Sequence, residues 1–202
     1  MLQTLLNDKL WLKLKTIILD LNIYDKPNLR NIFTGILYRL KTGCPWRYLP
    51  EYFGKYNTVF KTFRRWTKLD KFTKIFKQLI KDPDMEWLSI DGTTHNVKVV
   101  PELIKKVELK ETKILNADRG YISEDFKTSL LKNGVHPNIP NRKNSLKDNR
   151  HMDWHIYKAR HVVENMFATL KHFRGLATRY DKLKSSYSSN VALACAYVWL
   201  KL

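Results

Sequence analysis

Hydrophobic residues recur at helical spacing along the N-terminal part of the chain. Leucines and isoleucines placed between lysines predict a helix over 2–21, and a second helix is expected to stop at Gly43. Asn57 and Asp70 are typical caps for a third and a fourth helix. The stretch 42–56 is rich in aromatic residues, glycine and proline, and is predicted to be a loop held by packed rings. Several short helices with a basic outer surface indicate a helical, helix-turn-helix-like module, although periodicity alone does not distinguish it from an ordinary helical bundle.

The pattern changes type after the acidic, proline-containing stretch 81–86. Short apolar runs alternate with helical patterns, which predicts a mainly parallel sheet covered by helices. The predicted strands are 87–90, 97–100, 113–117 and 135–139; one helix begins at Pro101, another follows Ser123 with Phe126, Leu130 and Leu131 buried, and a buried helix over 191–202 closes the chain. The chain is therefore expected to be an α/β protein with a helical domain over 1–83 and a second domain over 84–202.

The charge of the chain points to a polyanionic partner. Its net charge of +18 exceeds what solubility requires, and the excess positive charges repel one another in the folded state. Residues 1–83 hold 17 Lys and Arg against 6 Asp and Glu, a net charge of +11. The sequence has no apolar run long enough for a membrane span and no apolar signal region, which predicts a cytoplasmic protein without membrane contact. Cys44 and Cys195 lack metal-ligand spacing, so structural zinc is not expected.

The segment YKARHVVENMFATLK combines charge with a specific geometry. On a single helix, Tyr157, Arg160, Glu164 and Lys171 fall within roughly 60° of one another and form a polar stripe beside an apolar arc. That arc consists of Ile156, Val162, Val163, Met166, Phe167, Leu170 and Phe173. A carboxylate at the border of a buried face can reach a site on the surface of a core. The alternative is an ordinary i,i+4 pair between Arg160 and Glu164.

Two aspartates stand where predicted strands end. Asp91 follows 87–90 and Asp118 follows 113–117, and a glycine within two residues of each lets the backbone turn away from the carboxylate. Sites in open parallel sheets form at this end of the strands. With Glu164, the aspartates can supply three hard oxygen donors, the ligands that two magnesium ions need in phosphodiester chemistry. Either aspartate can instead cap a turn or a helix.

These residues, taken in order, resemble the bacterial insertion-sequence transposases of the DDE class. TGCPWRYLPEYFG is similar to the signature of their N-terminal domain, SIDGTT to the segment with the first acid, and NADRGY to the segment with the second. Tyr157, Arg160, Glu164 and Lys171 reproduce the Y-x2-R-x3-E-x6-K signature that holds the third. The final stretch ATRYDKLKSSYSSNVALACAYVWL is similar to the family's C-terminal end, so the resemblance covers nearly the whole chain.

The resemblance implies a helical DNA-binding domain followed by an RNase H-like catalytic domain. It implies cleavage at transposon ends by water and strand transfer by the freed 3′-hydroxyl, with Asp91, Asp118 and Glu164 holding Mg²⁺, for which Mn²⁺ substitutes. The expected partner is double-stranded DNA of the terminal inverted repeats and of the target, bound by a homodimer at the bacterial nucleoid. The side chains expected to bind this DNA are Tyr157, Arg160 and Lys171 of the helix, and Arg142 and Lys143 of the basic loop 140–153.

One spacing departs from the family. Asp91 and Asp118 are 27 positions apart, whereas the family places a much longer segment there, which provides the second and third strands of its sheet. Loss of those strands is expected to leave the first strand as an exposed edge beside the strand that ends at Asp118. Because a catalytic site needs its groups held to about half an ångström, we expect weak or absent activity despite the complete set of acids.

Two other functions are consistent with parts of the sequence. A sequence-specific DNA-binding protein without catalysis fits the same basic residues and would bind transposon ends without dependence on magnesium. A basic RNA-binding protein fits the charge, but it leaves the ordered acids unexplained. Trp46, Tyr48 and Trp66 have the chemistry to stack on bases, although aromatic residues in helical modules lie more often in the core.

Overall fold

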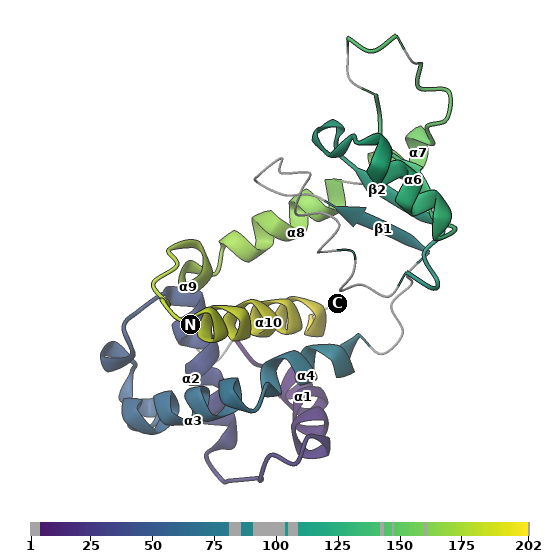
Figure 1. The fold of residues 1–202 in the computed structure, drawn as a ribbon. Helices are drawn as coiled ribbons and strands as arrows, with labels where there is room; N and C mark the ends of the chain where they lie inside the picture. Colours follow the sequence, from purple (N-terminus) through teal and green to yellow (C-terminus); the bar gives the residue numbers. More distant parts are fainter. Residues whose placement is uncertain are drawn as a thin grey trace. The chain divides into compact units, whose positions relative to one another are not determined.

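The computed structural model describes residues 5–80, 86–90, 104, 109–141, 144–146, 148–159 and 161–201 (Figure 1). The chain divides into two compact units, of which unit 1 comprises Met1–Asp82 and Ala168–Leu202, and unit 2 comprises Pro83–Phe167. The predicted strand over 97–100 and, apart from Ile104, the helix predicted from Pro101 lie outside the described residues. Within the described ranges, no helix is both long and apolar enough to span a membrane.

Unit 1 is helical and is built from both ends of the chain. Its elements are α1 (Asp8–Asp20), α2 (Leu29–Thr42), η1 (Trp46–Tyr48), η2 (Glu51–Phe53), α3 (Tyr56–Lys68), α4 (Lys71–Leu79), α9 (Arg174–Ala177) and α10 (Lys184–Leu200). The yellow helix α10 packs most extensively against α4 and also contacts α2 and α3 (Figure 1). The apolar side chains of these helices form one core, so Ala168–Leu202 pack with the N-terminal helices in one compact unit.

The helices of unit 1 lie close to their predicted positions, but their caps differ in detail. α1 begins at Asp8 and not at residue 2, because the Asn7 side chain accepts a hydrogen bond from a first-turn N–H at 2.9 Å and caps the helix there. Gly43, with φ 69°, ends α2 as predicted. Asn57 lies inside α3 and is not its cap. Asp70 precedes α4 as predicted, but its side chain makes no capping hydrogen bond.

The aromatic loop between α2 and α3 is held by ring contacts, as the sequence predicts. The Trp46 ring packs on Phe60 and Phe63 of α3 with centroid distances of 5.4 and 5.2 Å. The Phe53 ring lies 5.3 Å from that of Tyr38 on α2. These contacts fix a loop that contains only two short 3-10 turns of its own.

A buried ion pair joins the two chain segments of unit 1. Arg39 Nη1 on α2 donates to Asp181 Oδ2 at 2.7 Å, and the two side chains are only 7% and 12% exposed. Asn190 Nδ2 on α10 donates to the same carboxylate oxygen at 2.8 Å. At the other end of α10, the Tyr197 hydroxyl donates to the carbonyl of Leu5 at 2.6 Å. The C-terminal segment is therefore fixed to the N-terminal helices by paired polar groups as well as by apolar burial.

Unit 2 contains a small parallel sheet in the order β1-β2-β3. Its elements are β1 (Trp87–Ile90), β2 (Ile114–Ala117), η4 (Arg119–Tyr121), α6 (Glu124–Lys132), β3 (His136–Asn138) and α7 (Trp154–Lys158). Phe126 and Leu130 of α6 pack with the sheet residue Leu115, as predicted, while Leu131 points to solvent at 58% exposure because it lies on the opposite face of this short helix. Trp87 is 48% exposed, and among the described strands β1 pairs only with β2.

The segment predicted as one helix from Tyr157 to Lys171 forms two helices, α7 and α8 (His161–Lys171). α7 ends where the Ala159 N–H turns back to the Ile156 carbonyl at 3.1 Å, and His161 Nδ1 donates to the Lys158 carbonyl at 2.6 Å. These local contacts satisfy carbonyls that a continuous helix would have used. The predicted apolar arc is only partly buried: Ile156 and Phe173 are in cores, whereas Val162 and Phe167 are 59% and 43% exposed. The boundary between the units falls within α8, after Phe167.

Candidate functional site

β2 places Asp118 directly after its C-terminal end. Ile90 and Ala117 are register partners in neighbouring parallel strands, so the residues that directly precede Asp91 and Asp118 lie side by side. Asp91 itself lies outside the described residues. Asp118 is half-buried, and its Oδ1 accepts the Arg119 backbone N–H at 2.6 Å, which caps η4. Within the described part of the chain, Asp118 Oδ2 makes no hydrogen bond.

The predicted polar stripe is divided between two helices. Tyr157 is half-buried on α7, where its ring meets the Trp154 ring edge-on at 5.8 Å. Glu164 is exposed in the first turn of α8, where a carboxylate is favoured by the helix dipole, and Lys171 is the exposed last residue of α8. Tyr157 and Glu164 belong to unit 2 and Lys171 to unit 1. The other predicted DNA contacts, Arg142, Lys143 and Arg160, lie outside the described residues.

The donor chemistry of the described acids fits a hard divalent cation. Carboxylate oxygens are the preferred ligands of Mg²⁺, and Asp118 and Glu164 both present carboxylates that solvent can reach. Among the residues that the structure describes, no three His, Cys, Asp or Glu side chains are grouped as a metal site would require. The third predicted ligand, Asp91, is not one of those residues.

Buried asparagines anchor α7 to the sheet, a feature that the hydrophobic pattern did not reveal. Asn138 Nδ2 on β3 donates to Asn116 Oδ1 on β2 at 2.7 Å and to the Asp153 carbonyl at 2.9 Å. Asn138 Oδ1 accepts the Asp153 N–H at 2.9 Å, and Asn116 Nδ2 reaches the Ile156 carbonyl at 3.4 Å. The start of α7 is thereby fixed to the strand that leads into Asp118. Asparagine inside a strand is unusual, and this was the signal available in the sequence.

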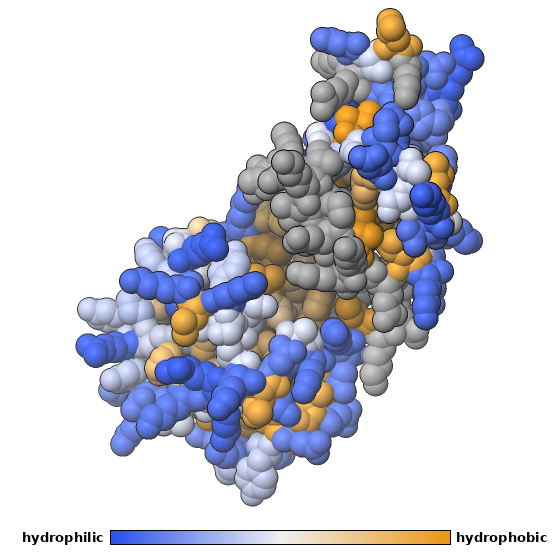
Figure 2. All heavy atoms as spheres, in the orientation of Figure 1, coloured by the Kyte–Doolittle hydropathy of each residue, from blue (hydrophilic) through white to orange (hydrophobic). Residues whose placement is uncertain are grey.

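A basic face runs along α3 in unit 1. Lys61, Arg64, Arg65 and Lys68 are all exposed and fall within about 100° around the helix, and α3 contains no acidic residue. Unit 1 as a whole holds 23 Lys and Arg against 7 Asp and Glu, a net charge of +16 out of +18 for the chain. The side of unit 1 seen in Figure 2 is correspondingly hydrophilic. The spacing of these four cations was readable in the sequence, but it did not enter the predicted DNA contacts.

Two family models match the chain. Residues 6–76 match the family described as "Putative transposase of IS4/5 family", and residues 115–201 match the one described as "Transposase DDE domain". The first match covers α1 to α3 and most of α4, including the basic face of α3. The second includes Asp118 and Glu164 and begins after Asp91.

Curated relatives match parts of the chain. It is 42% identical over 50 residues to "Putative transposase for insertion sequence element IS6501" of Brucella ovis, which covers 25% of this chain and 38% of that protein. It is 32% identical over 68 residues to "Uncharacterized protein y4sN" of Sinorhizobium fredii, a match that covers 34% of this chain and 54% of that protein. It is 30% identical over 90 residues to "Putative transposase for insertion sequence element IS402" of Burkholderia cepacia, a match that covers 45% of this chain and 40% of that protein.

These matches span between 38% and 54% of the length of the relatives. No solved structure matches the chain significantly. The two family models nevertheless cover most of the chain in the expected order, and two of the three relatives are named as transposases. The chain belongs to the insertion-sequence transposases of the DDE class.

Proposed function

We propose that the chain binds the double-stranded DNA of transposon ends through unit 1 and carries carboxylates for metal-dependent cleavage and strand transfer in unit 2. Membership of the family supports DNA transposition in general. The observation that most directly supports the catalytic part is the register of β1 and β2, which pairs Ile90 with Ala117 and so aligns the strand ends that lead into Asp91 and Asp118.

The charge distribution supports DNA binding by unit 1. A duplex carries closely spaced phosphates, and each lysine or arginine that contacts one releases condensed counterions. The basic face of α3 offers four such cations without a neighbouring acid on the same helix. We assign the main phosphate contacts to this face, with Arg142, Lys143, Tyr157, Arg160 and Lys171 as further contacts. Two copies of the chain are expected to hold the paired ends at the nucleoid.

Asp91, Asp118 and Glu164 would hold two divalent cations, Mg²⁺ or Mn²⁺. When bound, such cations activate the attacking oxygen and stabilise the leaving oxygen of a phosphodiester. The role of the protein is to position its carboxylates: Oδ1 of Asp118 caps η4 and fixes the side chain, which leaves Oδ2 to coordinate. Water would cleave the strand at the transposon end, and the 3′-hydroxyl that is freed would then attack the target strand.

A second candidate function is DNA binding without catalysis. Val162 and Phe167, on the helix that carries Glu164, are exposed, and β1 has an exposed Trp87. Exposed apolar residues on α8 leave less packing to fix the position of this helix, and catalysis depends on positions fixed to about half an ångström. These observations favour weak activity, and in the limit a protein that occupies transposon ends without cutting them.

A combined binding and nicking assay tests both functions. The purified chain is titrated onto a duplex that carries the terminal inverted repeat of its element, with and without Mg²⁺, and nicked strands are counted. We expect binding without metal, and slow nicking that requires Mg²⁺ and disappears in Asp118→Asn but not in the matched control Asp125→Asn, an exposed acid on α6. Binding without any nicking would select the second candidate, and absence of DNA binding would reject both.

A further inference from the structure

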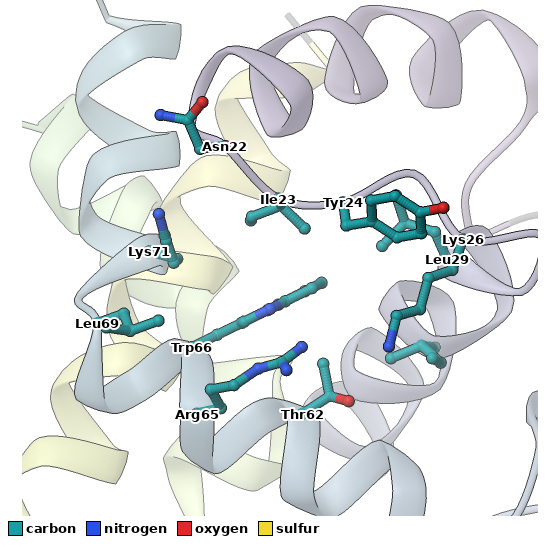
Figure 3. Close-up of a pocket in the computed structure, with 11 residues that line it drawn as sticks. Asn22, Ile23, Tyr24, Lys26, Leu29, Thr62, Arg65, Trp66, Leu69 and Lys71 are labelled. Carbon is teal, nitrogen blue, oxygen red and sulfur yellow. The ribbon is translucent and has the colours of Figure 1, made fainter.

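Unit 1 contains a pocket beside the basic face of α3. Its volume is about 260 Å³, and it is lined by the connection between α1 and α2, by the first turn of α2, by α3 and by the start of α4 (Figure 3). We call it the α3 pocket and define it by Ile23, Tyr24, Lys26, Leu29, Arg65 and Trp66. It shares Arg65 with the basic face, so a DNA bound on that face would lie next to the pocket.

The floor of the α3 pocket is apolar and its rim carries an aromatic ring. Ile23, Leu29 and Trp66 are buried, with exposures of 7%, 3% and 2%, and they supply the floor. The Trp66 ring is fixed from behind by Phe33, at a centroid distance of 6.1 Å. Tyr24 is 77% exposed at the rim, where a flat group could stack on its ring. A planar apolar group therefore has a suitable surface here.

The charges of the α3 pocket are all positive. Among the described residues that line it there is no Asp or Glu, and the side chains of Lys26 and Arg65 point toward one another across it (Figure 3). Within the described part of the chain neither side chain forms an ion pair, and the nearby Asp25 is held by Lys15 at 2.8 Å. Two converging cations without a counter-ion repel each other, and an anion placed between them relieves that repulsion.

We propose that the α3 pocket binds a single nucleotide, with its phosphate between Lys26 and Arg65 and its base on Tyr24 and the apolar floor. An anion with a flat apolar body is the ligand that this combination of rim and floor fits. The volume lies just below the roughly 300–1,000 Å³ of pockets for drug-sized ligands, so it admits one base but no paired duplex. The nucleotide is either an unpaired one within bound DNA or a free one, and the first source rests on the proposed DNA binding.

The test compares three labelled duplexes by fluorescence anisotropy with the full chain. One is fully paired, one has a single unpaired nucleotide, and one has an abasic residue at that position. We expect the duplex with the unpaired nucleotide to bind about tenfold tighter than the other two. Arg65→Gln should remove this preference, while Arg47→Gln, the same charge change at an exposed arginine on η1 outside the pocket and the basic face, should keep it. Thr62→Phe, which fills the pocket without changing charge, should also remove it.

Each outcome decides between the alternatives. Equal affinity for all three duplexes overturns the DNA-linked source but leaves the proposed function intact. If the abasic and the unpaired-base duplexes bind with equal affinity, and both bind tighter than the paired one, the pocket does not bind the base. Deoxyadenosine monophosphate titrated alone by calorimetry tests the free source: binding to the wild type that Arg65→Gln abolishes supports the pocket even if no DNA binds. The inference is overturned entirely if all three duplexes bind equally well and deoxyadenosine monophosphate does not bind.

Discussion

At the scale of single residues, Asp118 caps η4, and we propose that the same carboxylate has a catalytic role. Asp118→Asn keeps an Oδ1 acceptor for the Arg119 N–H, so η4 and the fold should persist, but it removes the negative charge. We predict that Mg²⁺-dependent nicking falls about 100-fold or more, as expected for a loss of about 3 kcal/mol of transition-state stabilisation. Thermal unfolding followed by circular dichroism should change little. Nicking equal to that of Asp125→Asn would contradict the assignment.

Arg39 is the residue on which the ion pair inside unit 1 depends. Arg39→Met keeps much of the side-chain volume but leaves the Asp181 carboxylate buried without its cation. We predict that the free energy of unfolding of unit 1 falls by about 3 kcal/mol, measured by chemical denaturation. Adding Asp181→Asn should recover part of this loss, because the remaining buried group is then neutral. A double variant as unstable as Arg39→Met alone would show that the pair is not responsible.

At the scale of elements, the sequence predicted best those features that depend only on the residues within one helix or strand. The end of α2 at Gly43 and the strands that precede Asp91 and Asp118 were predicted correctly, because a C-cap glycine and a short apolar run act locally. The break between α7 and α8 was not, since no proline or glycine marks it. At the break the Ala159 N–H and His161 Nδ1 donate to the Ile156 and Lys158 carbonyls, and the helical spacing of the sequence does not indicate these local contacts.

The asparagine contacts that anchor α7 yield a prediction for this element. Asn138→Leu has a similar volume but leaves Asn116 Oδ1 and the Asp153 N–H without their partner in a buried site. We predict a loss of about 2–4 kcal/mol in the stability of unit 2 and faster amide hydrogen exchange in α7. The exposed Asn133→Leu is the control and should have a small effect. Unchanged exchange in α7 would show that the asparagines do not fix it.

At the scale of the whole molecule, the N-terminal and C-terminal segments form one unit. Pro83–Phe167, which carries the proposed catalytic acids, forms the other. The apolar pattern of α10 predicted its burial correctly but contains no information about its partner, so its packing against α4 was not predicted. Asp118 and Glu164 belong to unit 2, and the helix α8 that carries Glu164 continues into unit 1. The chain therefore connects the acidic segment directly to the unit that holds most of the positive charge.

That charge distribution predicts how DNA binding depends on salt. If the four cations of the basic face of α3 each neutralise one phosphate, the logarithm of the association constant should fall with the logarithm of salt concentration at a slope of about −3.6 from this face alone. Replacing Arg64 and Lys68 by glutamine should lower the magnitude of the slope by about 2. Anisotropy titrations at several salt concentrations measure it. A slope that these substitutions leave unchanged would place the DNA elsewhere.

The central claim is that Asp118 and Glu164 share one divalent-metal site. Mn²⁺ titrated onto the full chain and followed by electron paramagnetic resonance of the free ion tests this most directly, because it does not depend on weak activity. We predict that Asp118→Asn and Glu164→Gln each weaken Mn²⁺ binding about tenfold or more, whereas Asp125→Asn does not. Equal Mn²⁺ affinity in the wild type and all three variants would contradict the claim.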